Sequence, residues 1–136
     1  MDLSVFMNQA LCEHPQTDFY VSSRFDKDGE PTFFKIKAIS EMENQQLRRS
    51  CMTYKKGDLF PSIDYDKYIE LLVTTCCVCP DFKDADLQKF HGCMGEQDLV
   101  KKMLLPGEYI KLANKIKQLC GFDRSESELV EELKNA

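Results

Sequence analysis

A stripe of apolar residues near the middle of the chain constrains the fold more than any other feature. Four residues follow the spacing i, i+3, i+4, i+7, namely Ile69, Leu72, Val73 and Cys76. This spacing places their side chains on one face of an α-helix. Pro80 then ends the helix, since proline lacks the backbone N–H that a helix interior needs. A one-sided stripe must be covered by other elements, so we expect this helix to form the centre of a hydrophobic core.

Capping residues mark where further helices begin. Ser40 and Glu43 form a capping box. In this motif the serine hydroxyl accepts a hydrogen bond from the backbone amide at position N3, and the glutamate side chain accepts one from the backbone amide of the serine. Either Asp64 or Asp66 can cap the central helix, and Pro106 suits a first helical position. Together with the apolar spacing, these signals predict helices at residues 3–12, 40–52, 84–90, 96–104 and 106–120, beside the central one and a last one from residue 125.

The apolar period changes to two between residues 18 and 39. Alternating residues predict two strands, one with Phe19, Val21, Ser23 and Phe25 and one with Phe34, Ile36 and Ala38. We expect a β-hairpin with its turn at residues 26–31, and a loop at residues 53–63. The predicted fold is mainly α within the α+β class: a single domain, residues 1–136, of about five to six helices with one β-hairpin near its N-terminus.

Composition excludes several classes of protein. The chain has 136 residues with a formal net charge of −5, which suits one globular domain and argues against a binder of nucleic acid. The longest uncharged stretch covers residues 71–80, far shorter than a membrane helix. An acid at position 2 is unlike the basic start of a signal peptide. We therefore expect a soluble protein of the cytosol, with no membrane and no nucleic acid among its partners.

The seven cysteines raise the question of a metal site. Cys76-x-x-Cys79 has the spacing of a zinc knuckle, and His91 and Cys93 supply two further ligand types. Against zinc, Cys76 and Cys77 fall within the predicted central helix, where thiols pack as small apolar groups. Against redox catalysis, these cysteines lie near a helix C-terminus, whose field disfavours the thiolate. We expect packed, reduced thiols and no metal or other cofactor. A small zinc- or thiol-dependent protein is the alternative.

Motifs for catalysis are missing from the sequence. There is no Gly-x-Ser-x-Gly, no glycine-rich phosphate loop, and the two histidines, His14 and His91, stand beside a proline and a glycine. The paired acids Asp64/Asp66 and Asp84/Asp86 are explained as helix caps and first-turn charges. We do not expect an enzyme.

The order of several residue blocks resembles the family of XkdN-like phage tail assembly chaperones, found in PBSX-type prophages. The resemblance covers nearly the whole chain, in order. The blocks are Ser22-Ser23-Arg24-Phe25, Phe34-Lys35-Ile36-Lys37-Ala38-Ile39, Glu43-Asn44 to Leu47-Arg48, Asp66-Lys67-Tyr68, residues 80–88, Lys101-Lys102-Met103-Leu104-Leu105-Pro106-Gly107-Glu108-Tyr109 and Gly121-Phe122-Asp123.

The resemblance implies a role in binding rather than catalysis. Members of this family bind the long tape measure protein and keep it soluble until the tail tube polymerises around it. Such a protein acts in the cytoplasm of the bacterial host and is not expected in the mature virion. A structural component of the tail is a further alternative, and self-association into a homo-oligomer is left open.

Covering amphipathic helices of a client requires an apolar surface, the helix-in-groove mode of recognition. We expect this surface to draw on the last two helices and the junction before them. The candidate contacts are Leu104, Leu105, Pro106, Tyr109, Leu129, Val130 and Leu133. The competing interpretation is that these residues belong to the hydrophobic core, as apolar stripes usually do.

Overall fold

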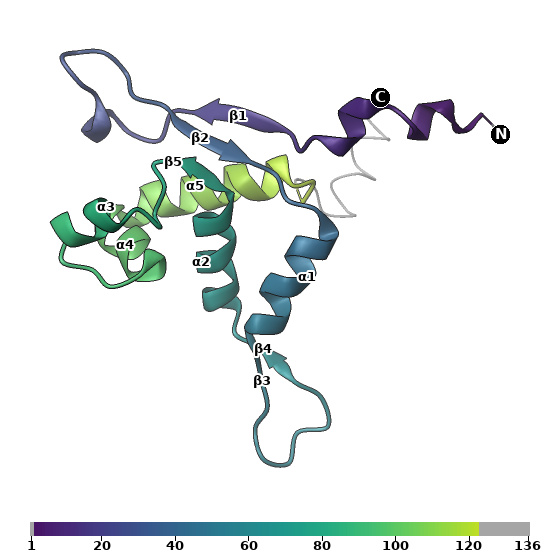
Figure 1. Cartoon of the computed structure of the whole chain (residues 1–136). Helices are drawn as coiled ribbons and strands as arrows, with labels where there is room; N and C mark the ends of the chain where they lie inside the picture. Colours follow the sequence, from purple (N-terminus) through teal and green to yellow (C-terminus); the bar gives the residue numbers. More distant parts are fainter. Residues whose placement is uncertain (1, 123–136) are drawn as a thin grey trace, which may run out of the picture.

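The computed structural model describes residues 2–122 as a mixed α+β domain (Figure 1). The α-helices are α1 (Glu41–Ser50), α2 (Tyr65–Cys76), α3 (Ala85–Phe90), α4 (Glu96–Met103) and α5 (Pro106–Leu119). The strands are β1 (Gln16–Phe19), β2 (Phe34–Lys37), β3 (Met52–Thr53), β4 (Ser62–Ile63) and β5 (Cys77–Cys79). Short 3-10 helices cover Leu3–Phe6, Gln9–Cys12 and Ser23–Phe25. The helix predicted from residue 125, with Leu129, Val130 and Leu133, lies outside the described residues.

Helix α2 forms the centre of the core, as its stripe predicts. Leu72, Val73 and Cys76 are fully buried, and Ile69 packs at the edge of the same cluster. The helix is in contact with α1, α4, α5 and strand β5. Asp64 caps its N-terminus by accepting a hydrogen bond from the Lys67 amide at 3.2 Å. Among the helices of residues 2–122, none has the length and apolar character to cross a membrane.

The other predicted caps are confirmed. The Ser40 hydroxyl accepts from the Glu43 amide at 3.2 Å, and the Glu43 carboxylate accepts from the Ser40 amide at 3.3 Å, which completes the capping box of α1. Asp84 caps α3 through the Leu87 amide at 2.9 Å, and α5 begins at Pro106. These starts are fixed by local chemistry and so can be identified without tertiary information.

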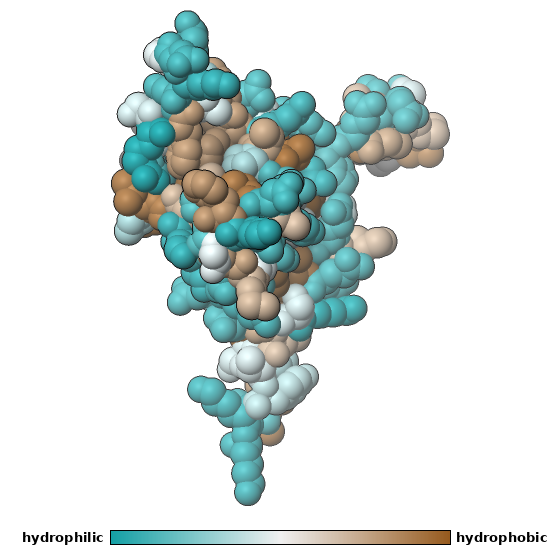
Figure 2. Space-filling view, turned by 60° about the vertical axis from the view of Figure 1, so that its left-hand side comes forward, coloured by the Kyte–Doolittle hydropathy of each residue, from teal (hydrophilic) through white to brown (hydrophobic). Residues whose placement is uncertain are grey.

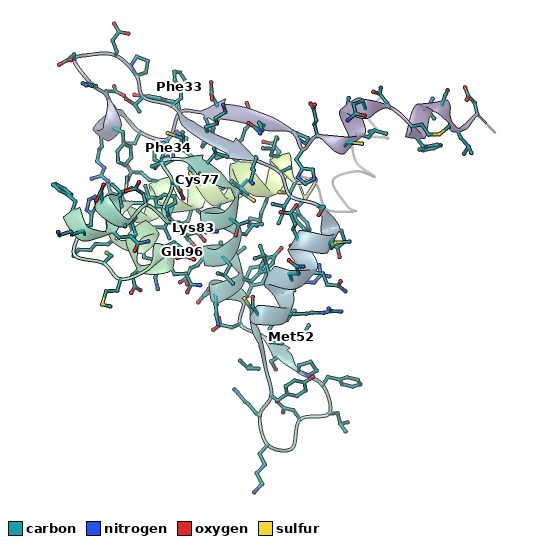
Figure 3. All side chains as sticks on the ribbon, viewed as in Figure 1. Phe33, Phe34, Met52, Cys77, Lys83 and Glu96 are labelled. Atoms are coloured by element: carbon teal, nitrogen blue, oxygen red, sulfur yellow. The ribbon has the colours of Figure 1, made fainter. Side chains whose placement is uncertain are left out.

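Strands β1, β2 and β5 form an antiparallel sheet with β2 in the middle. Phe34 and Ile36 of β2 point into the core, whereas Lys35 points away, which confirms the predicted alternation. Figure 3 shows Phe34 on the side of the helices and its neighbour Phe33 on the opposite side. Phe33 packs instead against the Tyr20 ring, at 5.6 Å between centroids.

The first strand of the predicted hairpin is wrong in extent. β1 covers only Gln16–Phe19, paired with Phe34–Lys37, and the chain then leaves the sheet before Ser23–Phe25 forms a 3-10 helix. The turn lies where it is expected: Lys27 and Glu30 exchange two 2.9 Å hydrogen bonds around Asp28 and Gly29, both with positive φ. The strand ends early because the Ser22 hydroxyl caps the 3-10 helix, which gives that backbone a local alternative to the sheet.

Two further strand pairings were not predicted. Cys77–Cys79, expected at the end of the central helix, forms β5 and pairs with Lys35 and Ile36. Residues 53–63, expected to be a loop, begin and end in the two-residue strands β3 and β4, which form a second hairpin. The domain therefore contains more sheet than the single N-terminal hairpin of the prediction. β5 forms by pairing with the distant strand β2, and β3 and β4 are too short to show a period of two, so local periodicity carries no trace of either pairing.

The predicted helix at residues 3–12 is replaced by two short 3-10 helices. Asp2 and Asn8 cap them with side-chain hydrogen bonds of 2.9 Å to the amides of Ser4 and Ala10. The apolar residues of this segment are exposed, and Figure 1 shows it extending away from the body of the domain. A helix of this length needs a surface on which to bury its apolar face, and the segment has none within the described domain.

An ion pair between Arg24 and Glu108 joins distant parts of the fold. The guanidinium donates to both carboxylate oxygens, at 2.9 and 2.8 Å, and to the carbonyl of Met103 at 3.0 Å. The same carboxylate accepts the Leu105 amide at 2.8 Å and thereby caps α5. Glu108 is only 8% exposed. A bidentate pair of this kind combines strong hydrogen bonds with fixed geometry, so it holds the connection between β1 and β2 against the α4–α5 junction.

We predict that Glu108→Gln destabilises the domain by on the order of 2 kcal/mol, because it removes charge-assisted hydrogen bonds from a mostly buried site. Urea unfolding at pH 7 measures the loss. The matched control is Glu41→Gln, which removes the carboxylate of the exposed Glu41–Arg48 pair and should cost clearly less. Equal losses in the two variants would contradict the role assigned to Glu108.

The stabilising effect of Glu108 should depend on pH. Hydrogen bonding from Arg24 lowers the pKa of Glu108 from its ordinary 4.5 to about 2. A carboxyl group whose pKa is lowered by folding contributes stability that is fully present above its unfolded pKa. The difference in unfolding free energy between the wild type and Glu108→Gln should therefore be constant near neutral pH and shrink between about pH 4.5 and pH 2. A difference that stayed constant throughout acid titration would show that the carboxylate charge is unimportant.

Candidate functional site

A groove between α1, α2 and the C-terminal end of α5 is the most apolar hollow described. It has a volume of about 370 Å³ and is open on one side. Figure 1 shows α1 and α2 converging toward the β3–β4 hairpin, and residues of both helices line the groove. Its lining residues come from four elements or their ends: Asn44, Arg48, Ile63, Tyr65, Tyr68, Leu72, Lys117 and Phe122.

A chain of hydrogen bonds forms one wall of the groove. The buried Tyr68 hydroxyl donates to the Asn44 side-chain carbonyl, and the Asn44 amide donates to Glu41 at 3.0 Å. Glu41 also accepts two bonds from Arg48, at 2.9 and 3.3 Å. Burial raises the pKa of Tyr68, so its hydroxyl stays protonated and remains a donor. The network connects α2 to α1 and holds the two inclined helices at a fixed separation where they approach each other.

The mouth of the groove combines exposed apolar groups with positive charge. Tyr65 is 61% exposed and its ring lies 6.0 Å from that of Tyr68, measured between centroids. Phe122, which follows α5, is 55% exposed. Arg48 and Lys117 are the charged residues among those that line it. A hollow with an apolar floor and a basic edge suits an amphipathic helix whose polar side is acidic.

Exposed apolar side chains also occur on two projections of the domain. The β3–β4 hairpin carries Leu59 and Phe60, which are 91% and 78% exposed. The N-terminal 3-10 helices expose Phe6 and Met7 among others. Figure 2 shows both projections standing out from the body, each with hydrophobic and hydrophilic residues side by side. Exposed apolar residues grouped in this way are typical of surfaces that bind other proteins.

The residues predicted to contact a partner lie in different environments. Leu104 is buried in the core, so its side chain does not reach the surface. Leu105 and Pro106 are exposed at the start of α5. Tyr109 is partly buried beside them, and burial raises its pKa to about 12. Leu129, Val130 and Leu133 lie outside the described residues. Surface contact thus remains a prediction for the exposed members of the set.

The cysteine cluster is not arranged as a metal centre. Cys76 is fully buried at the end of α2, whereas Cys79 is exposed in β5. Cys93 instead donates a weak hydrogen bond to the His91 carbonyl at 3.7 Å. Within residues 2–122, no group of three or more Cys, His, Asp or Glu side chains could hold a metal ion. The zinc alternative therefore finds no support in the geometry.

The thiols at the end of α2 are held in their neutral form. A hydrogen bond with Cys120 and burial raise the pKa of Cys76, and burial raises the pKa of Cys77 to about 12. A thiol needs a lowered pKa to act as a nucleophile at neutral pH. These two residues therefore pack as small apolar side chains, in agreement with the prediction.

The groove itself was missed in the sequence. Its polar wall depends on Asn44 and Tyr68, which lie 24 residues apart. A polar residue inside a predicted helix gives no sign of whether it faces water or a neighbouring helix. One available signal was the run of aromatic residues at Tyr65 and Tyr68, spaced i, i+3 at the start of the central helix. Their spacing puts both on one face, beside the predicted stripe.

Comparisons with known proteins agree on one family. The family model described as phage XkdN-like tail assembly chaperone protein matches residues 3–134. Two proteins of Bacillus subtilis strain 168 are similar over 98% of this chain: the uncharacterized protein YqbN, 30% identical with 93% of its length covered, and the phage-like element PBSX protein XkdN, 29% identical with 94% covered. The crystal structure of YqbN has a TM-score of 0.77 and 26% identity, covering 90% of this chain and 98% of that one.

We predict that Tyr68→Phe destabilises the domain by roughly 1 to 3 kcal/mol, because it leaves the buried Asn44 carbonyl without its donor. Tyr65→Phe is the matched control: it removes a hydroxyl from an exposed ring of the same helix face and should have little effect. Urea unfolding of the two variants makes the comparison. A Tyr68→Phe variant as stable as the wild type would show that the network is not needed.

Thiol labelling should separate the cysteines by burial. With a disulfide reagent at pH 8, Cys12 and Cys79 are expected to react first, because both are exposed. Cys51, Cys76 and Cys77 should react only as fast as the domain unfolds, since they are buried. Mass spectrometry of labelled peptides identifies the sites. Rapid labelling of Cys76 in the native protein, or protection of Cys79 that a chelator abolishes, would contradict this arrangement.

Proposed function

The chain belongs to the XkdN-like family of phage tail assembly chaperones, and from that premise we propose that it binds the tape measure protein and keeps it soluble during tail assembly. The observation that carries the proposal is the family match over residues 3–134, nearly the whole chain. A chaperone of this kind works by covering surface, so it needs exposed apolar groups rather than a reactive centre. We propose that the protein acts without catalysis and without a cofactor.

The surface of the domain supports such a role. Large apolar side chains are exposed on a protein with a formal net charge of −5. The apolar groups can cover the hydrophobic face of a client helix, and the net charge keeps the complexes apart through mutual repulsion. A helix laid against such a surface is recognised through residues spaced i, i+3, i+4 and i+7.

The α4–α5 junction is the proposed contact surface for the client. Leu105 and Pro106 are exposed there, Tyr109 is partly buried, and Ile110 adds a side chain that is 58% exposed. The Arg24–Glu108 ion pair holds this junction in place from beneath. A rigid support limits the entropy lost when a partner binds, which favours affinity.

The proposed site of action is the cytoplasm of the bacterial host, before the tail is complete. A chaperone that is released when the tube forms is absent from the mature virion. A structural component of the tail would remain in it. The two roles therefore differ in a quantity that can be measured directly.

Coexpression with the tape measure protein of the same locus tests the proposed function. We expect the tape measure protein to be insoluble alone and to become soluble and copurify when this chain is present. Quantitative mass spectrometry of purified mature particles should then find the chain depleted. A tape measure protein that stays insoluble would overturn the chaperone proposal, and a fixed stoichiometry in mature particles would favour the structural role.

Paired variants locate the client surface. Leu105→Ser with Ile110→Ser should reduce the amount of soluble tape measure protein severalfold, because both side chains are exposed where the client is proposed to bind. Leu59→Ser with Phe60→Ser is the matched control, since it changes two exposed apolar residues on the distant β3–β4 hairpin. Circular dichroism confirms that each variant is folded. If only the hairpin pair reduces solubility, the proposed surface is wrong.

A further inference from the structure

The N-terminal arm, residues 2–13, carries an apolar face that is not buried within the described domain. Every residue of the arm is exposed. Five of its apolar residues follow the spacing i, i+3, i+4, i+7, i+8, which marks one face of an α-helix: Leu3, Phe6, Met7, Ala10 and Leu11. The arm instead forms two four-residue 3-10 helices. A short amphipathic helix is stable only when its apolar face is buried, so the sequence suits a surface that the arm does not contact here.

The arm points away from its own domain. The Pro15 carbonyl accepts the Ala38 amide at 2.8 Å, immediately before β1 begins at Gln16. Glu13 is extended, with φ −104° and ψ 135°, and His14 is restricted to extended backbone because a proline follows it. The chain therefore runs from the arm into β1 without a reversal, and Figure 1 shows the arm leaving the domain beyond the start of β1. A surface that covers the arm in this position belongs to a second molecule.

The groove between α1, α2 and the end of α5 has the apolar character that such a face requires. Ile63 and Tyr65 line it and are 44% and 61% exposed. A smaller hollow of about 210 Å³ adjoins the groove, sharing Asn44 and Phe122 with it, and extends to Ile39 before the start of α1. The two hollows together follow α1 and provide room for a helical segment rather than for a single side chain.

The charges of the arm and the groove are of opposite sign. The arm contains two acidic residues and no Lys or Arg. Lys117 lines the groove, and Lys111 and Lys115 line a hollow that shares Lys117 with it. Arg48 also lines the groove and is paired with Glu41, so the three lysines make this edge net positive. In a chain of net charge −5, a basic edge favours docking of an acidic segment at this place over the rest of the surface.

The lengths of the two surfaces agree. The α2 side of the groove extends from Tyr65 to Leu72, which at 1.5 Å per residue is about 10 Å. The apolar face of the arm extends from Leu3 to Leu11, which is about 12 Å in an α-helix. The arm can therefore lie along the groove over almost its whole apolar face.

Two copies of the chain can exchange their arms symmetrically. The base of the arm lies beside the start of α1, where His14 Nδ1 is 3.7 Å from the Glu43 carboxylate. The groove lies along the same helix, so a two-fold axis next to α1 can bring each arm to the groove of the other copy. Closed two-fold symmetry is the commonest arrangement of soluble oligomers, and it leaves neither arm nor groove unfilled.

We propose that the protein forms a homodimer in which residues 3–11 of each copy dock as an amphipathic helix in the α1–α2 groove of the other. Phe6 and Met7 lie against the apolar floor beside Tyr65, and the acidic ends of the arm face the lysines at the edge. The dimer concerns two copies of this chain and needs no client, so it can fail while the proposed function holds.

Matched arm variants test the dimer by sedimentation velocity of the full chain over a range of concentrations. We expect the wild type to dimerise, and Phe6→Asp with Met7→Asp to weaken the dimer by at least about tenfold, as loss of apolar anchors does. Asn8→Asp with Gln9→Asp adds the same charge on the opposite face of the predicted helix and should leave the dimer intact. A monomeric wild type, or equal weakening by both double variants, would overturn the proposal.

A variant in the groove identifies where the arm docks. Tyr65→Asp should also weaken the dimer, whereas Tyr54→Asp changes an exposed tyrosine of the β3–β4 hairpin and should not. Circular dichroism confirms that each variant is folded. If the Tyr65→Asp chain dimerises like the wild type, the groove does not receive the arm and the proposal is wrong.

Mixing the two defective chains separates arm exchange from other modes of pairing. The Phe6→Asp, Met7→Asp chain keeps an intact groove, and the Tyr65→Asp chain keeps an intact arm, so their mixture can form one of the two contacts. We expect the mixture to contain mixed dimers at concentrations where each chain alone is monomeric. A mixture that stays monomeric would rule out docking of an arm in the partner's groove. If the wild type is monomeric and the arm variant instead reduces the amount of soluble tape measure protein, the arm contacts the client and the dimer is excluded.

Discussion

The Arg24–Glu108 ion pair connects parts of the domain that no backbone hydrogen bonds join. The Glu108 carboxylate caps α5 by accepting a hydrogen bond from the Leu105 amide. It also accepts two hydrogen bonds from the guanidinium of Arg24, which lies in the connection between β1 and β2. The guanidinium in turn binds the Met103 carbonyl at the end of α4. Both residues belong to blocks that carry the family resemblance, one in Ser22–Phe25 and one in Leu104–Tyr109. Two of the residue blocks that carry the family resemblance therefore also have a structural role, because their Arg24 and Glu108 fix the start of α5.

The transition from α2 to β5 joins the two layers of the domain. Cys76 ends the helix and Cys77 begins the strand, so the central helix and the sheet share a junction without a loop. Phe34 and Ile36 of the middle strand meet Leu72, Val73 and Cys76 in one buried cluster. The cysteines here serve packing: small, weakly polar and neutral, they fit where a helix must give way to a strand.

Local chemistry made some of the fold predictable. The capping box at Ser40, the cap at Asp64 and the start at Pro106 depend on residues within one helical turn, and each lies where the sequence places it. Strand β5 depends on pairing with the distant strand β2, the β3–β4 hairpin on two-residue strands too short to show a pattern, and the groove on a contact between Asn44 and Tyr68 of different helices. Sequence periodicity describes which residues are buried, but not what buries them.

Helix α1 differs from the other wall of the groove in how it is anchored. Asn44 is the one residue of α1 that is classed as buried. Helix α1 packs mainly on α2, whereas α2 also contacts α4, α5 and β5. One side of the groove is therefore immobilised by the core and the other is attached largely through a polar network at its surface. The contact between Asn44 and Tyr68 therefore sets the width of the hollow, and its loss would free α1 more readily than α2.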